Sequence, residues 1–490
     1  MSSILLHVKV GLVSLGCPKN LVDSEVMLGL AQQGGHELTQ DAGEADVLIV
    51  NTCAFIDSAK QESIDTILEM ARHKADGSCK RLIVTGCMAE RYRDELKKEI
   101  PEIDAVLGTG QVPEIVGAIT GGATPMTFYR ARGSTGSPRA VGDPLGPHPS
   151  IVAGDPLVPS HKPLGPGALP TYIYDAETPR LMATPKHYAY VKIAEGCDYK
   201  CAFCIIPTLR GEYRSRPGDS IVREARALAA RGVKELLLIS QDTTFYGVDR
   251  KERGALGRLL RELDTVEGLE WIRLLYLYPT TITDDVLDAM AECEKVCRYV
   301  DLPLQHASAG VLKRMRRPGN RRTYDALLSR IRARVPGVTL RTTFIVGFPG
   351  ETDADFRELE SFVDDTRFDH IGVFTYSHEE GTRAFAVSDD VPAATKRSRR
   401  GRLMQRQRRI VEKAQAERIG TNVRVLIDGP SAEHELVVQG RLEGQAPEID
   451  PVVYLTDCDP AEFRPGDLVD AAVVGAQGYD LLVAPQRQGS

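Results

Sequence analysis

Two periodicities of apolar residues alternate over the first hundred residues of the chain. Short β-branched runs with the pattern of buried strands occur at residues 8–15, 46–50, 81–85 and 105–107. Between these runs, apolar residues recur at helical spacing over residues 21–31, 58–71 and 89–99. Strands that alternate with helices are typical of a parallel sheet covered by helices. We therefore expect a parallel α/β domain over residues 6–125.

This pattern is lost between residues 134 and 170, where nine prolines and six glycines occur among 37 positions. A segment of this composition cannot bury enough apolar surface to offset the entropy cost of ordering it. We expect residues 134–170 to form a Pro/Gly-rich disordered insertion between two domains.

A second alternation of strands and helices begins near residue 188. Its six strand candidates are residues 190–194, 236–240, 272–276, 299–303, 339–346 and 371–374. Six strands with intervening helices predict an incomplete (β/α)6 barrel over residues 183–415. Residues 396–418, with ten basic and two acidic side chains, form either a solvated helix that links two domains or a partner-binding surface.

The last 70 residues change to short alternating strands separated by turn signals. The strand candidates are residues 423–427, 435–440, 452–455, 468–474 and 480–483. They predict a small all-β barrel over residues 418–486. The fold class is therefore α/β, with a parallel α/β domain, a partial barrel and a terminal β-barrel.

Composition narrows the class of protein further. The chain has 490 residues, 42% hydrophobic and 26% charged, which excludes collagen-like, coiled-coil and wholly disordered classes. No apolar run approaches the ~18 residues of a membrane span, and His7 and Lys9 interrupt the apolar start. A net charge of −7 argues against a general nucleic-acid binder. Ten cysteines are too sparse for a disulfide scaffold, and their grouping favours metal ligation in a reducing compartment, so we expect the cytoplasm.

The strongest chemical signal is a group of three cysteines directly after the first barrel strand. Cys197, Cys201 and Cys204 have the spacing Cys-x3-Cys-x2-Cys. A cubane of four irons needs four ligands, so three thiolates leave one iron open to a small molecule. The alternatives are a zinc site, which prefers four protein ligands in closed geometry, and a buried apolar turn.

A second group of three cysteines is spread over the first domain. Cys17, Cys53 and Cys87 each follow the carboxyl end of a different predicted strand. In an open parallel sheet these ends share one edge, where ligands bind, so the three thiolates could meet. The alternative is that each cysteine is a small buried apolar residue.

The other cysteines are not expected to bind metal. Cys79 precedes its strand, and Cys458 has no partner in its domain. Cys293 and Cys297 are placed at i, i+4 on a predicted helix, where core packing is favoured over metal binding.

The segment from Gly196 to Cys204 resembles the cluster motif of radical S-adenosylmethionine (SAM) enzymes. With two three-cysteine groups, a barrel and a small terminal β-domain, the chain is similar to the methylthiotransferases of that superfamily. The resemblance implies two 4Fe-4S clusters, a radical-SAM core barrel and a TRAM-like terminal barrel. It implies radical generation from SAM at the barrel triad and sulfur supply at the first-domain triad. A second SAM would donate the methyl group, so that C–H becomes C–S–CH3.

The same resemblance suggests which residues contact SAM. Phe203 matches an aromatic position beside the adenine, and Ile345 and Gly347 match a fifth-strand element that lies against it. Ser240, Gln241 and Gln305 end barrel strands at the rim where such enzymes bind substrate. The alternative is ordinary core packing for Phe203, a strand-ending turn for Ile345 and Gly347, and a structural hydrogen bond at the rim for Ser240, Gln241 and Gln305.

Branches of the methylthiotransferase family act either on an aspartate of ribosomal protein S-twelve or on a tRNA adenosine beside the anticodon. Asp198 and Asp242 stand where the tRNA branch tends to have Asn, so the chain resembles the ribosomal-protein branch. We therefore predict methylthiolation of the aspartate β-carbon of S-twelve, alone or within the small subunit, with the tRNA as the alternative. The expected further partners are a sulfur carrier and an electron donor such as flavodoxin or ferredoxin, without a membrane.

Charge supports the same substrate independently. From residue 421 onward the chain has twelve Asp or Glu and four Arg. A tRNA-binding domain should present basic residues to phosphates, whereas an acidic domain suits a basic ribosomal protein or merely aids solubility. Arg210, Arg214 and Arg216 follow the barrel motif and could grip the target aspartate or the SAM carboxylate, or lie on a surface loop.

Overall fold

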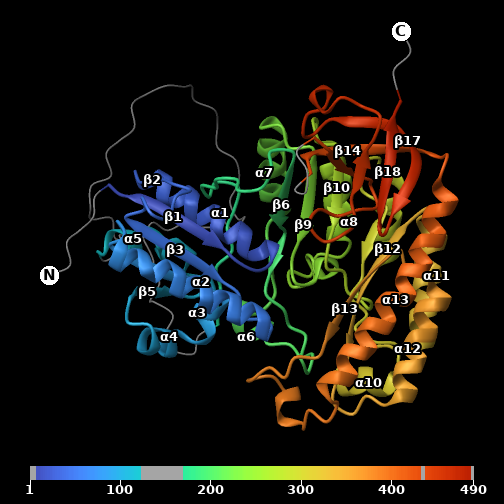
Figure 1. Ribbon diagram of the computed structural model, residues 1–490, viewed down its shortest axis with the longest axis horizontal. Coiled ribbons are helices and arrows are strands. Elements are labelled where there is room, and N and C mark those ends of the chain that lie inside the picture. The colour runs from blue at the N-terminus through green and yellow to red at the C-terminus, as the bar shows by residue number, and fades with distance from the viewer. Residues whose placement is uncertain (1–6, 123–168, 432–435, 487–490) are drawn as a thin grey trace.

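The computed structural model describes residues 7–122, 169–431 and 436–486 (Figure 1). Almost all of the expected insertion over residues 134–170 lies outside this part of the chain. Figure 1 shows the first domain in blue beside a green and yellow barrel, with the terminal barrel in red at the upper right of the view.

The first domain is a five-stranded sheet of order β2-β1-β3-β4-β5 in which every pair is parallel. Its strands are β1 (Lys9–Ser14), β2 (Glu37–Leu38), β3 (Val47–Thr52), β4 (Arg81–Gly86) and β5 (Ile103–Leu107). Its helices are α1 (Pro18–Gln33), α2 (Asp57–Asp76), α3 (Cys87–Arg91), α4 (Arg93–Glu99), α5 (Ile115–Thr120) and the 3-10 helix η1 (Thr109–Glu114). The predicted parallel α/β architecture is confirmed. The expectation of one helix over residues 89–99 is wrong, because Tyr92 leaves the helical region (φ −128°, ψ 37°) and separates α3 from α4.

The barrel consists of two three-stranded parallel sheets, β10-β9-β6 and β11-β12-β13, which a bridge between Ile272 and Val296 connects. Its strands are β6 (Tyr188–Lys192), β9 (Glu235–Ile239), β10 (Trp271–Leu274), β11 (Tyr299–Asp301), β12 (Thr339–Val346) and β13 (His370–Thr375). Between them lie the helices α7 (Gly218–Ala230), α8 (Ala255–Asp264), α9 (Asp284–Glu292), α10 (Ala309–Arg314), α11 (Arg321–Arg334) and α12 (Asp353–Thr366). The six predicted strands are all present, which confirms the partial barrel.

Shorter elements follow the first and second barrel strands and the last one. They are β7 (Ala194–Glu195), α6 (Ile206–Arg210), β8 (Arg214–Ser215), and the 3-10 helices η2 (Thr243–Phe245) and η3 (Ala384–Ala386). The predicted helical pair of Cys293 and Cys297 is wrong, because α9 ends at Glu292 and Cys297 lies in the segment before β11. Both thiols are buried.

Alternate residues of the barrel strands pack in opposite directions. Ala189 and Val191 of β6 belong to the large core shared with the barrel helices. Tyr188 and Tyr190 of the same strand belong to a second core with Val22 and Val26 of α1, which also includes Leu426 of the terminal barrel. The inner face of β6 is therefore covered by the first domain, and apolar packing joins all three parts.

A long helix leads to the terminal barrel. Helix α13 (Ala393–Arg418) runs beside α12 and reaches the red barrel in Figure 1. The barrel is closed in the order β14-β15-β16-β18-β17. Its elements are β14 (Asn422–Pro430), β15 (Val438–Arg441), β16 (Val453–Leu455), η4 (Pro460–Glu462), β17 (Leu468–Gln477) and β18 (Asp480–Pro485). This confirms the predicted small all-β barrel.

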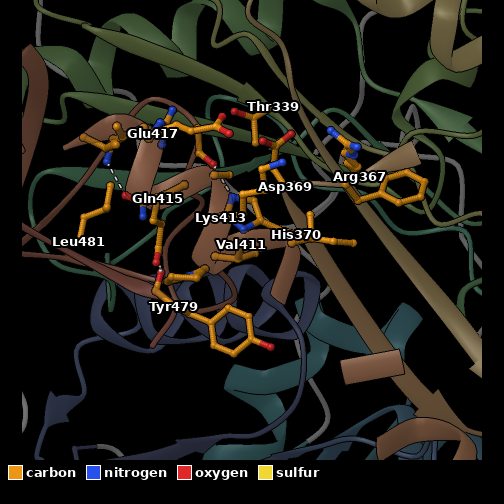
Figure 2. A pocket seen from close by; sticks show the side chains of 18 residues that line it. Thr339, Arg367, Asp369, His370, Val411, Lys413, Gln415, Glu417, Tyr479 and Leu481 are labelled. Carbon is orange, nitrogen blue, oxygen red and sulfur yellow. Dashed lines mark hydrogen bonds between the residues drawn. The ribbon is translucent and has the colours of Figure 1, made fainter. Parts of the chain in front are cut away.

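Side chains of α13 fix the terminal barrel in place. Figure 2 shows Gln415 pointing toward the loop of Tyr479, whose carbonyl accepts a hydrogen bond from the Gln415 amide (2.6 Å). His370 of β13 lies 2.9 Å from the Gly444 carbonyl on the same side. A cavity of about 200 Å³ lies among these residues.

Within the described residues, no helix has the length and apolar character needed to cross a membrane.

Candidate functional site

The first cysteine triad lies at the carboxyl edge of the parallel sheet. Cys17 is the N-cap of α1, Cys53 follows β3, and Cys87 begins α3 directly after β4. Gly16 has φ +89°, and a Cβ added there would stand 2.8 Å from the Cβ of Cys53. Only glycine fits this close approach of two strand ends.

The end of β4 is equally close to its neighbour. Gly86 has φ +93°, and a Cβ there would stand 2.6 Å from the Thr52 carbonyl oxygen and would also overlap the side chain of Asn51. This packing holds Cys87 against the strand end that precedes Cys53.

Asn20 ties the three strand ends together. Its amide donates hydrogen bonds to the carbonyls of Leu15 (3.0 Å) and Thr52 (2.8 Å), and its Oδ1 lies 3.8 Å from the Cys87 sulfur. Burial raises the pKa of Cys87 to about 12; the nearby Arg210 acts against this shift, and Cys17 and Cys53 act with it. Thiols in this setting ionise when a metal displaces the proton, which fits a cluster-binding role.

The second triad is held in the loop between β7 and α6. Gly196 has φ +87°, and a Cβ there would stand 2.6 Å from the carbonyl carbon of Glu212. The Cys197 amide donates to the Gly211 carbonyl (3.0 Å), and the Ala202 amide donates to the Met315 carbonyl (2.8 Å). The loop is therefore fastened on both sides of the central cysteine.

Burial raises the pKa of Cys204 to about 12 and that of Cys197 to about 11. The charges of Cys201 and Cys197 act on Cys204 in the same direction, so the three thiols lie within electrostatic reach. Among the described residues, no three His, Cys, Asp or Glu are placed to hold one metal ion. In a cubane each thiolate binds a different iron, so its ligands do not need to converge on one point.

Aromatic and charged side chains support the barrel triad. Tyr199 donates to Asp242 (2.9 Å) and stacks on Tyr278, with ring centroids 3.9 Å apart. The Arg317 guanidinium lies 4.1 Å from the Tyr278 ring centroid and 3.9 Å from the Cys201 sulfur. Asp198 accepts from the Tyr213 amide (2.9 Å), which again fixes the loop. Asp242 and Asp198 thus act here as supports of the cysteine loop.

A buried ion-pair network separates the two triads. Lys192 lies 2.5 Å from both Asp23 and Glu195, and Arg210 lies 2.6 Å from Asp23 and 3.4 Å from Glu195. Burial alone would raise the pKa of Glu195, but Lys192 and Arg210 hold it well below its usual range. Arg210 also donates toward the Cys87 sulfur at 3.7 Å. One guanidinium thus contacts a thiol of the first triad and Glu195, two residues before Cys197.

The three arginines after the barrel motif are engaged inside the protein. Arg214 donates to the carbonyls of Arg210, Glu212 and Tyr172, and Arg216 pairs with Glu224 at 2.6 Å. Arg210 belongs to the ion-pair network. All three arginines therefore bind groups inside the protein, and none of them lies on the surface in a position to grip a substrate.

A cavity of about 660 Å³ lies between the first domain and the barrel. Its lining includes three of the six predicted SAM contacts, Phe203, Gln305 and Ile345. Gln305 has φ +73°, a conformation that side-chain-bearing residues rarely adopt and that is concentrated at functional sites. Phe55 contributes to the same cavity from the first domain.

The other three predicted contacts lie elsewhere. Ser240 is fully buried, with its hydroxyl 3.4 Å from that of Thr243. The Gln241 amide donates to Glu195 (2.5 Å), so this residue joins the ion-pair network. The Gly347 amide donates to Glu351 (2.5 Å), and the Lys396 side chain occupies the space where a Cβ would be.

Sequence reasoning missed the polar face of α1. Lys19, Asn20, Asp23 and Glu25 are all buried against the barrel. Lys19 lies over the Tyr276 ring, 2.9 Å from its centroid, and burial lowers the pKa of its amine to about 8. The available signal was a run of charged and polar residues that interrupts the apolar face of the helix.

Comparison with known proteins was made for the whole chain. Residues 9–108 match the uncharacterized protein family UPF0004, residues 191–363 the radical SAM superfamily, and residues 419–485 the TRAM domain. The protein named ribosomal protein uS12 methylthiotransferase RimO in Koribacter versatilis is 47% identical over 97% of this chain and 95% of its own length. The protein of the same name in Pelotomaculum thermopropionicum is 46% identical over 97% of this chain and 99% of its own length. The chain belongs to the RimO methylthiotransferase family.

A solved structure shows the same fold despite low identity. The radical SAM methyltransferase TsrM from Kitasatospora setae superimposes with a TM-score of 0.51 at 14% identity, over 76% of this chain and 73% of that one. For a RimO-family protein, this likeness supports the α/β barrel architecture and carries no argument about substrate.

Proposed function

We propose that this protein replaces a β-carbon hydrogen of an aspartate in ribosomal protein uS12 with a methylthio group. The observation that carries the proposal is the presence of two cysteine triads on either side of one buried ion-pair network, in a chain of the RimO family. Two SAM molecules are consumed, one as the radical source and one as the methyl donor. The radical chemistry is needed because no side-chain base can remove a proton from such a carbon.

The cysteines are assigned to two 4Fe-4S clusters. Cys197, Cys201 and Cys204 hold the radical-generating cluster, and Cys17, Cys53 and Cys87 hold the other. When bound, these groups supply an electron for cleaving SAM at the barrel triad and sulfur at the first-domain triad. The donor sets fit, because each triad offers three thiols in a shielded site beside one buried arginine.

The residues of the protein bind and orient the small molecules. Phe203, Gln305 and Ile345 contact SAM in the large cavity and exclude water from it. Gln241 and Ser240 act one step away, because Gln241 positions Glu195 beside the cysteine loop and Ser240 packs under the strand end. Gly347 allows the close packing of α13 against β12 at the cavity wall.

Three domains divide the work in this proposal. Residues 6–125 carry the sulfur-supplying cluster, residues 183–415 form the radical-SAM core, and residues 418–486 form the TRAM-like barrel that recruits uS12. A flavodoxin or ferredoxin supplies electrons, and a sulfur carrier replenishes the sulfur. The location is the cytoplasm, where ribosomal subunits and reduced thiols are found.

The experiment compares two substrates with one enzyme preparation. The anaerobically reconstituted protein, expected to hold about eight irons per chain, is incubated with SAM, a reductant and either purified uS12 or bulk tRNA. Mass spectrometry should show a methylthio gain on an aspartate of uS12 and none on tRNA. Replacement of Cys17, Cys53 and Cys87 by Ala should abolish the gain while deoxyadenosine still forms. A gain on tRNA alone, or normal methylthiolation by the triple variant, would contradict the proposal.

A further inference from the structure

Two arginines of α13 line the large cavity opposite the first domain. Arg397 and Arg400 are three residues apart, so they lie on the same face of the helix. Both side chains are exposed to solvent. They share the cavity with Phe203, Gln305 and Ile345, the three proposed SAM contacts.

The carboxylates of this cavity are already neutralised. Lys60 lies 2.6 Å from Asp57 and 2.9 Å from Glu379, and Arg91 lies 3.2 Å from Glu379. Two carboxylates are thus balanced by two cations. The positive charges of Arg397 and Arg400 are left without compensation.

These two arginines also differ from their neighbours on the helix. Arg399, Arg402, Arg406 and Arg408 each pair with a carboxylate at 2.6 to 3.0 Å. In the described parts of the chain, the Arg397 side chain has no hydrogen-bond or ion-pair partner. Arg400 makes one bond, from Nε to the Val373 carbonyl (3.1 Å), which leaves both terminal nitrogens available.

We propose that Arg397 and Arg400 bind the side-chain carboxylate of the target aspartate, an inference that rests on the proposed function. Guanidinium groups match carboxylates in shape and charge, and two of them on one helix face can share a single carboxylate. The aspartate carboxylate is bonded directly to the β-carbon, so holding it fixes the direction of the C–H bond to be broken. The pair therefore orients the reacting carbon toward the SAM end of the cavity.

Aromatic side chains at the same cavity suit a polypeptide substrate. Phe55 of the first domain and Phe374 of β13 line it and are 40% and 51% exposed. Exposed aromatic rings are typical anchors for a bound peptide. The cavity thus combines an uncompensated positive pair with apolar surface, as an aspartate within a peptide loop requires.

The test pairs enzyme variants with a substrate variant. Arg397→Gln and Arg400→Gln are compared with Arg408→Gln, an arginine of the same helix that pairs with Glu412 outside the cavity. The KM for purified uS12 should rise about tenfold or more in each of the first two variants and stay unchanged in the third. Direct binding of uS12 is measured alongside, because it does not depend on turnover.

The substrate variant identifies the group that is bound. A uS12 whose target aspartate is replaced by Asn should bind wild-type enzyme more weakly, and Arg397→Gln should weaken its binding no further. Additive losses would overturn the inference. A rise in the SAM dissociation constant measured without uS12 would instead assign the arginines to the SAM carboxylate. If the enzyme methylthiolates uS12 but the arginine variants bind uS12 normally, the inference is refuted and the proposed function stands. If the enzyme acts only on tRNA, the proposed function itself is refuted.

Discussion

A buried arginine lies beside each cysteine triad. Arg210 approaches the Cys87 sulfur at 3.7 Å and Arg317 approaches the Cys201 sulfur at 3.9 Å. A positive charge or an N–H donor at a ligand sulfur favours the reduced cluster, because reduction adds negative charge there. The two arginines are therefore expected to set the reduction potentials of the two clusters separately.

Replacement of each arginine should move one potential and leave the other unchanged. Arg210→Gln is expected to make the potential of the first-domain cluster more negative, and Arg317→Gln to do the same for the barrel cluster. Each potential is measured by redox titration with electron paramagnetic resonance, in protein whose other triad is replaced by Ala. Arg210→Lys keeps the charge and should restore part of the shift.

Each arginine serves as the control for the other. A shift of both potentials by one substitution would indicate a general change of packing and contradict a local effect. Absence of any shift would show that the contact to sulfur has no electrostatic consequence.

At the residue scale, the two cysteine triads can be recognised in the sequence, whereas their charged surroundings cannot. Cysteine spacing and position after a strand are local features that can be recognised in a chain. The pairing of Asp23 with Lys192 and Arg210 joins residues more than 150 positions apart. No local pattern encodes such a contact, so Arg210 was assigned to substrate binding or the surface although it lies in the interior.

At the scale of elements, the site depends on how closely strand ends approach. Gly86 ends β4 with φ +93° and leaves no room for a Cβ beside Thr52. Gly86→Ala should push β4 away from β3 and displace Cys87. The iron content measured after reconstitution should then fall from about eight to about four per chain, with the barrel cluster retained.

Gly232→Ala is the matched control for this substitution. Gly232 has φ +96°, nearly the same backbone conformation, but no atom lies within 4 Å of the position a Cβ would take. Both variants carry the strain of a positive φ, and only Gly86→Ala adds the clash. Equal iron loss in the two variants would show that general instability, and not strand spacing, determines cluster binding.

The type and order of the elements could be predicted because their apolar periodicity is strong. All six barrel strands and the four main strands of the first sheet were found, since buried parallel strands are continuous apolar runs. The errors concern where helices end. Tyr92 and Cys293 terminate helices through backbone angles that neither glycine nor proline signals at those positions.

At the scale of the whole molecule, the terminal barrel differs from the large cavity in charge: the barrel is acidic, whereas the cavity carries two uncompensated arginines. Asp457 and Asp459 are exposed on the acidic terminal barrel. Glu433 and Glu435, two further acidic residues of this domain, lie outside the described residues. An acidic surface attracts a basic protein over distance, and salt weakens that attraction.

Neutralising this surface should weaken recruitment of uS12. Asp457→Asn with Asp459→Asn is expected to raise the KM for uS12 and to make it less sensitive to salt. Asn at 459 can still cap η4, so the fold is preserved. The control is Glu262→Gln with Glu267→Gln. These two substitutions also remove two negative charges, but from exposed positions of the partial (β/α)6 barrel. An unchanged salt dependence in the first pair would exclude the terminal barrel from recruitment.

How the three parts pack together was beyond sequence reasoning. The core that joins Tyr188, Val26 and Leu426 uses residues that each fit an ordinary buried position in their own domain. The apolar pattern of one sequence does not indicate which apolar face of one domain packs against which face of another. The large cavity, formed between two domains, could therefore not be predicted from the sequence, although three of its lining residues were.

The closure of the terminal barrel has a consequence for how a partner can be recognised. Because β17 pairs with both β14 and β18, each strand of the described barrel has a neighbour on both sides, and the sheet has no edge strand. A ribosomal protein cannot dock here by adding a strand to the sheet. Selectivity must then come from loops and outward-facing side chains, which can diverge between species without disturbing the hydrogen-bonded scaffold beneath them.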